Sequence, residues 1–128
     1  MLEKCDKGWL IIDASCQEFF NQSGQIENRI NTNGNYFNNV RECWLLKAPK
    51  GMAVKYQFST LLTEKNRDVI TIYDGPNSDS RVITKASGYV EPATEFYGKN
   101  DVNLIRFQTD NGIHYKGFTL QWQVVDRK

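Results

Sequence analysis

The amino-acid sequence predicts an all-β protein in which two antiparallel sheets pack face to face as a β-sandwich. Apolar and polar residues alternate along several short segments, as they do in half-buried strands. Clusters of Asn, Gly, Ser and Pro separate these segments at the spacing of turns. No long stretch carries apolar residues at the period of a helix. With 128 residues and 40% hydrophobic content, the chain is long enough to close a core as one domain.

The segment 68–75, which reads Asp-Val-Ile-Thr-Ile-Tyr-Asp-Gly, is the strand around which we expect the others to stack. Its β-branched residues run directly into an Asp-Gly turn. Val69, Thr71 and Tyr73 share one face of this strand. Ile70 and Ile72 share the other. Because both faces carry apolar residues, we expect a central strand that is covered on both sides.

Three further strand signals precede this segment. Residues 9–12 form a short apolar run that favours an edge strand or a hairpin arm. Residues 42–48 carry Trp44 and Leu46 at a two-residue period, and Val54, Tyr56 and Phe58 alternate with polar residues. The intervening residues 21–39 are rich in turn formers and predict loops, as does the polar segment 60–67.

Four strand signals follow. Residues 81–84 form a weak strand and residues 95–97 a short one. Residues 102–109 alternate imperfectly, because Leu104 and Ile105 are adjacent. The clearest alternation comes last, where every second residue of 118–124 is apolar: Phe118, Leu120, Trp122 and Val124.

The charge and hydropathy of the chain exclude several classes of protein. The formal net charge is +1 and no run of like charges occurs, so we expect neither nucleic-acid binding nor binding to a membrane surface. No apolar run approaches the ~18 residues of a membrane span. The first residues lack the pattern of a signal peptide. The chain is therefore either cytosolic or a piece of a longer secreted protein.

Cysteine usage and a glycosylation motif favour the second alternative only weakly. The three cysteines, Cys5, Cys16 and Cys43, leave one without a partner inside the chain if the other two pair. One histidine is too few for the usual zinc sites. Asn21 opens an Asn-Gln-Ser triplet that permits N-glycosylation in a secreted protein.

Several segments, in order along the chain, resemble the motifs of a CUB domain, a compact extracellular β-sandwich with a jelly-roll-like fold. The matching features are Cys16 and Gly24, residues 35–39 followed by Cys43-Trp44, the Ala-Pro-Lys-Gly turn at 48–51, the strand 68–75, the Phe-Gln-Thr-Asp segment 107–110, and Gly117-Phe118 with Trp122. The resemblance covers about residues 16–125. We therefore expect a CUB-like domain at 16–128, preceded by an N-terminal extension or the remnant of another module at 1–15.

The resemblance implies a disulfide between Cys16 and Cys43, whose loop closure stabilises the fold by about 3.5 kcal/mol in the entropic account. The second disulfide usual in the family is missing, because Lys65 and Ser87 stand near the expected positions. Cys5 then pairs upstream or with another chain. An alternative pairs Cys5 with Cys16, as in the opening hairpin of a C-type lectin domain, and free thiols remain open for a cytosolic protein.

Many CUB domains hold one calcium ion at an end of the sandwich, where the site receives a Lys or Arg of a partner. Carried over to this chain, the family pattern matches Asp68 and Asp110 as ligands and Tyr36 as a supporting residue, and Asn111 offers a further oxygen. Glu64 is the nearest candidate for the glutamate of the set, although the loop before Asp68 is shorter than usual. Thr60 occupies the position that the usual spacing gives to this glutamate.

Without calcium, the same acids have structural roles, with Asp68 capping a turn and Asp110 accepting bonds from backbone N–H groups.

The sequence thus predicts an extracellular or ectodomain recognition module, associated with neighbouring modules of its chain. Tyr36, Asp68 and Asp110 would engage a basic side chain of a partner protein, with or without calcium. The alternative is a sugar-binding sandwich that uses aromatic platforms. Trp44 and Trp122 read as core residues, which leaves Trp9 as the exposed candidate.

Catalysis is not expected. The single histidine, His114, falls in a predicted loop, and no nucleophile elbow accompanies it.

Overall fold

The computed structural model describes residues 16–112 and 115–126, and in them every regular element is a β-strand. The strands are β1 (Gln17–Phe19), β2 (Ser23–Glu27), β3 (Arg41–Lys47), β4 (Met52–Leu62), β5 (Val69–Tyr73), β6 (Val82–Ala86), β7 (Glu95–Gly98), β8 (Val102–Gln108) and β9 (Gly117–Asp126). Among the described residues, none forms a helix that could span a membrane.

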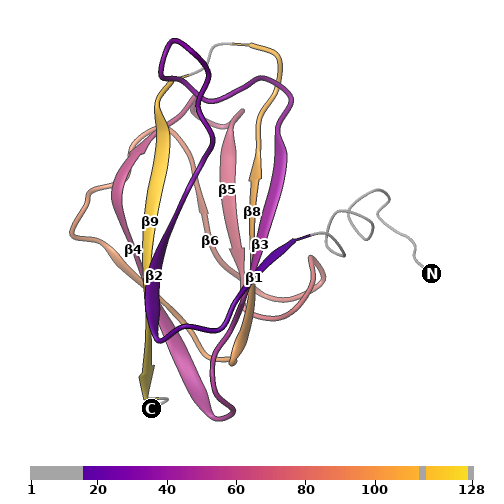
Figure 1. The fold of residues 1–128 in the computed structure, drawn as a ribbon, viewed down its shortest axis with the longest axis vertical. Helices are drawn as coiled ribbons and strands as arrows, with labels where there is room; N and C mark the ends of the chain where they lie inside the picture. Colours follow the sequence, from indigo (N-terminus) through magenta and orange to yellow (C-terminus); the bar gives the residue numbers. More distant parts are fainter. Residues whose placement is uncertain (1–15, 113–114, 127–128) are drawn as a thin grey trace.

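The strands form two sheets that pack against each other. One sheet has five strands in the order β1-β3-β8-β5-β6, and the other has four in the order β2-β9-β4-β7. All neighbouring strands are antiparallel except β1 and β3, which are parallel. Figure 1 shows the strands running along the long axis of the molecule, with the loops gathered at its two ends. The predicted antiparallel β-sandwich is therefore confirmed.

Aromatic side chains fill the space between the sheets. Phe118 of β9 packs edge-on against Phe107 of β8 and Phe58 of β4, with ring centroids 5.0 and 6.2 Å apart. Trp44 and Trp122 are buried in the same cluster, as their strand phase predicts. These two tryptophans consequently offer no platform for a sugar, and Trp9 lies outside the described residues.

The central strand is confirmed, with one refinement. β5 lies inside the five-stranded sheet, between β8 and β6. Its Ile70 and Ile72 are fully buried in the main core. Tyr73 is buried on the opposite face, in a small cluster with Leu104 and Cys43, and the Arg106 guanidinium lies 5.3 Å from its ring. Both faces are thus largely buried, but the second sheet covers only one of them.

Two segments differ from the sequence prediction. Residues 23–27 form β2 inside the region predicted to be loops. β4 continues to Leu62, through part of the predicted polar excursion. A register shift between Phe58 and Thr60 moves Leu61 into the core and Thr60 to the surface, which ends the simple alternation of the strand. The predicted strand at 9–12 lies outside the described residues, as do Cys5 and His114.

Candidate functional site

The predicted site residues come from three loops at one end of the sandwich. This end, at which β2, β4, β6 and β8 finish, lies opposite the C-terminus in Figure 1. Tyr36 lies between β2 and β3, Glu64 lies between β4 and β5, and Asp110 follows β8. We call it the acidic end, after Glu64, Asp68 and Asp110.

A tight turn between β4 and β5 brings Glu64 beside Asp68. The N–H groups of Arg67 and Asp68 both donate to the carbonyl of Glu64, at 3.1 and 3.0 Å. Asn66 adopts a φ of 65°, a conformation that Asn tolerates better than most residues. This tight turn thus places Glu64 next to Asp68, although the loop that holds Glu64 is short.

Asp68 is fully buried and connects the three loops. The Tyr36 hydroxyl donates a hydrogen bond to Oδ2 of Asp68, and the backbone N–H of Asp110 donates to Oδ1 at 3.0 Å. The Tyr36 hydroxyl also accepts a bond of 3.1 Å from the backbone N–H of Glu64. These contacts fix the carboxylate of Asp68 and the backbone around the other two acids.

The three acids gather their oxygens in a small volume. One carboxylate oxygen from each of Glu64, Asp68 and Asp110 lies within 4.8 Å of the other two. Oε1 of Glu64 is buried, yet it has no hydrogen-bond partner among the described residues. An unsatisfied carboxylate oxygen among other carboxylates is unfavourable unless a cation or a proton compensates it.

Burial and mutual repulsion shift the pKa values of these acids. Burial raises the pKa of Glu64, and the negative charges of Asp110 and Asp68 raise it further. Burial also raises the pKa of Asp68, although the hydrogen bonds from Tyr36 and from the Asp110 N–H oppose it. Asp110 differs, because the N–H of Gly112 and the Arg67 guanidinium lower its pKa.

Arg67 contributes to the site, although the sequence did not predict it as a site residue. Its Nη1 lies 3.5 Å from Oδ2 of Asp110, and its side chain is largely exposed. It therefore places a positive charge on the solvent side of the three acids. The only signal in the sequence is that Arg67 is adjacent to Asp68.

The remaining predicted positions lie as follows. Asn111 is exposed in the same loop as Asp110. Thr60 is an exposed residue of β4 that pairs with Thr119. Glu64, and not the residue at position 60, supplies the glutamate of the acidic group. Asn21 is exposed just before β2, at the opposite end of the sandwich, so a glycan there would leave the acidic end clear.

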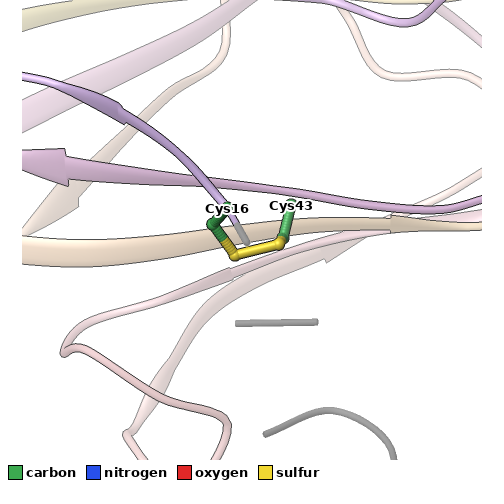
Figure 2. Close-up of a disulfide and its surroundings, with 2 residues drawn as sticks. All are labelled: Cys16 and Cys43. Carbon is green, nitrogen blue, oxygen red and sulfur yellow. A yellow bond between two sulfur atoms is a disulfide. The ribbon is translucent and has the colours of Figure 1, made fainter. Parts of the chain in front are cut away.

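The disulfide between Cys16 and Cys43 is present, with the two Cα atoms 4.9 Å apart (Figure 2). It joins the residue before β1 to β3. At the position of the missing second bridge, hydrogen bonds hold the two segments together instead. The N–H of Asn66 donates to the Ser87 hydroxyl at 2.9 Å, and the N–H of Gly88 donates to the Thr63 hydroxyl at 2.9 Å.

Comparisons with known proteins agree with this architecture. Residues 16–122 match the family model of the CUB domain. Rat cubilin is 26% identical over 96 residues, which are 71% of this chain and 3% of cubilin. Mouse tolloid-like protein 1 is 30% identical over 86 residues, which are 64% of this chain and 8% of that protein. The chain thus spans a small part of the curated relatives it matches.

A solved structure shares the fold. The MASP-1 CUB2 domain bound to Ca²⁺ superposes with a TM-score of 0.71 at 20% identity, over 84% of this chain and 96% of that one. CUB domains generally serve as interaction modules and not as catalysts. The match over residues 16–122 shows that the chain belongs to the CUB domain family, and is thus a domain of an extracellular protein or of the ectodomain of a membrane protein.

Proposed function

We propose that this module binds a partner protein through its acidic end, where a calcium ion held by Glu64, Asp68 and Asp110 helps to receive a Lys or Arg of the partner. The ion would supply the positive charge that allows three carboxylates to lie together. Tyr36 orients Asp68 through its hydroxyl, and the exposed amide of Asn111 offers a further oxygen. Neighbouring modules of the same chain would carry the domain to its partner.

The unpaired oxygen of Glu64 is the observation that supports this proposal most strongly. Oε1 is buried, lacks a hydrogen-bond partner among the described residues, and belongs to the group whose oxygens lie within 4.8 Å of one another. Calcium prefers several hard oxygen ligands, including carboxylates that use one or both oxygens. A purely structural role accounts for both oxygens of Asp68, but it leaves this oxygen of Glu64 unexplained.

Asp110 is the acid best placed to meet a partner. Its side chain is about one-third exposed, and Oδ2 already lies near the guanidinium of Arg67. A Lys or Arg of a partner would occupy a comparable position and form a charge-assisted hydrogen bond. Such a contact lies near solvent, so we expect it to weaken at high ionic strength.

Calorimetric titration with calcium chloride tests the metal site. The wild-type domain should bind calcium, and Asp110→Ala should abolish binding because a small site loses one ligand and one charge. Asp79→Ala is the matched control, since Asp79 is an exposed acid on the turn between β5 and β6. A flat titration of the wild-type domain would remove the calcium site.

The pH dependence of calcium affinity gives a second test of the same site. The raised pKa values of Glu64 and Asp68 mean that these acids take up protons above the usual range for carboxyls. Calcium requires them deprotonated, so its affinity should fall as pH drops through that range, with protons released on binding. A constant affinity from neutral to acid pH would contradict the assignment of these two ligands.

A further inference from the structure

Exposed apolar side chains are concentrated around the acidic end. The structure exposes eight large hydrophobic residues among those it describes, and five of them surround this end: Ile30, Phe37, Leu62, Tyr89 and Tyr115. The loops after β2 and β8 lie at the end of the molecule opposite the C-terminus in Figure 1, where β4 and β6 also finish. Exposed apolar groups that gather on one part of a surface, next to polar groups, are typical of an interaction site.

Three of these residues line one groove of about 450 Å³ on the outer side of the four-stranded sheet. Ile30 comes from the loop after β2, Leu62 is the last residue of β4, and Tyr89 forms a bridge with Leu62 from the loop after β6. Pro92 also lines the groove, and its polar lining includes Glu27, Thr60 and Lys116. We call this groove, lined by Ile30, Leu62, Tyr89 and Pro92, the apolar groove.

The apolar groove lies next to the three acids along the chain and in space. Leu62 and Glu64 are separated by the single residue Thr63, so their Cα atoms are at most about 7 Å apart. Thr63 is buried, whereas Leu62 faces the groove and Glu64 belongs to the group of acids. The same spacing separates residues i and i+2 of an extended peptide.

From this arrangement we infer that the apolar groove is a second subsite of the partner-binding surface, which holds a bulky aliphatic side chain beside the basic residue. The partner is thus a protein segment that carries a Lys or Arg and, about two residues away, a Leu-like side chain. This inference rests on the proposed function of the acidic end. Charge complementarity selects this occupant, since the acids take the cation and the adjacent groove takes the apolar group.

Four synthetic peptides separate the two contributions. Each is acetylated and amidated, with Lys or Gln at one position and Leu or Ser two positions later, between glycines. Titration into the ¹⁵N-labelled domain with calcium present measures their affinities by NMR. We expect the Lys–Leu peptide to bind roughly tenfold more tightly than the Lys–Ser peptide, because one leucine leaves water.

Two pairs of variants locate the apolar contact. Leu62→Thr should remove the preference for the Lys–Leu peptide, whereas Val82→Thr should retain it. Leu62 and Val82 are both 44% exposed on strands but lie at opposite ends of the sandwich. Tyr89→Ser and Tyr97→Ser form a second pair, at 65% and 53% exposure, and only Tyr89→Ser should reduce the preference.

The outcomes distinguish the two proposals. Equal binding of the Lys–Leu and Lys–Ser peptides, together with loss of both in Asp110→Ala, would overturn the apolar subsite and retain the acidic site. Binding that ignores the lysine, or no binding by any peptide, would overturn both. If the groove binds sugar, the NMR signal of Tyr89 would shift only when an oligosaccharide is added. If it binds a second copy of the domain, that signal would shift with protein concentration. Either result would contradict the inference.

Discussion

Asp68 is the residue that links the structural and chemical roles of the acidic end. Its two oxygens accept bonds from the Tyr36 hydroxyl and the Asp110 backbone, so it fixes the loops that carry the other acids. Asp110 in turn accepts a bond of 2.9 Å from the N–H of Gly112. Asp110 thus accepts a backbone bond, as the sequence suggested, whereas Asp68 links distant loops instead of capping a turn. Glu64 is left as the acid whose buried oxygen has no hydrogen-bond partner among the described residues.

Tyr36→Phe tests how much the hydroxyl stabilises this arrangement. The variant leaves the N–H of Glu64 and one oxygen of the buried Asp68 without their partner. We expect the free energy of unfolding in urea to fall by about 1–3 kcal/mol, as is usual for a buried hydrogen bond.

Tyr97→Phe is the matched control for this prediction. Its hydroxyl donates to Glu95 at 2.8 Å, but the tyrosine is exposed, so its loss should change the free energy of unfolding by less than about 0.5 kcal/mol. An equal fall in the free energy of unfolding in Tyr36→Phe and Tyr97→Phe would mean that the buried hydrogen bond stabilises the fold no more than the exposed one.

Asp74 ties several elements together at the opposite end of the sandwich. It is buried in the turn after β5 and accepts bonds from the backbone N–H groups of Lys99 and Asn100, at 3.0 and 2.9 Å. The guanidinium of Arg81, just before β6, lies 2.6 Å from Oδ2 of Asp74. The carboxylate thus joins the β5–β6 connection to the loop between β7 and β8.

The stability of the domain should depend on the ionisation of Asp74. Burial alone would raise its pKa, but the N–H groups of Lys99 and Asn100 and the guanidinium of Arg81 together lower it. A lowered folded-state pKa gives stability that is present above the unfolded-state value, near ~3.9, and is lost as pH falls through the folded-state value.

We therefore expect Asp74→Asn to lower the free energy of unfolding at neutral pH by roughly 2 kcal/mol, and to approach the wild type as pH falls below ~3.9. Urea unfolding across a pH series measures this difference. Asp79→Asn, at an exposed acid of the same turn region, should follow the wild type throughout. A difference between Asp74→Asn and wild type that is constant with pH would show that the charge is not responsible.

The elements that the sequence predicted well are those whose alternation is uninterrupted. β9 and the first part of β4 show one buried residue in two, which is the pattern that a sandwich imposes. β2 has only Ile26 buried, and it is held at the sheet edge by pairing with β9. The residues of β2 show no alternation of apolar and polar side chains, because pairing with β9, and not burial of their own side chains, makes them a strand.

For the whole molecule, the order of the motifs along the chain predicted the family. The arrangement of the site residues depended instead on the conformation of individual loops. The motifs around Cys16, Cys43, Asp68 and Asp110 predicted a sandwich with loops that converge at one end. The spacing of Glu64 did not fit the family pattern, because one tight turn replaces a longer loop. Arg67 and the apolar groove depend on loop conformation, which alternation of apolar residues does not report.

The disulfide between Cys16 and Cys43 should be a large contributor to the stability of the whole domain. It joins residues 27 positions apart, so its loss should lower the free energy of unfolding by about 3.5 kcal/mol in the entropic account. The contacts of Asn66 with Ser87 and of Gly88 with Thr63 are hydrogen bonds that form only in the folded state, so they cannot restrain the unfolded chain as a second bridge would.

Cys16→Ala with Cys43→Ala, in a Cys5→Ser background, tests this prediction by urea unfolding against the same background with the bridge intact. The bridge restrains the unfolded chain. Without it, the slope of the unfolding free energy against urea concentration should rise slightly, while the urea concentration at the midpoint of unfolding falls. Calcium affinity should stay unchanged, since the bridge touches none of the three acids. If the free energy of unfolding falls by less than about 1 kcal/mol, strand pairing and not the bridge holds β1 in place.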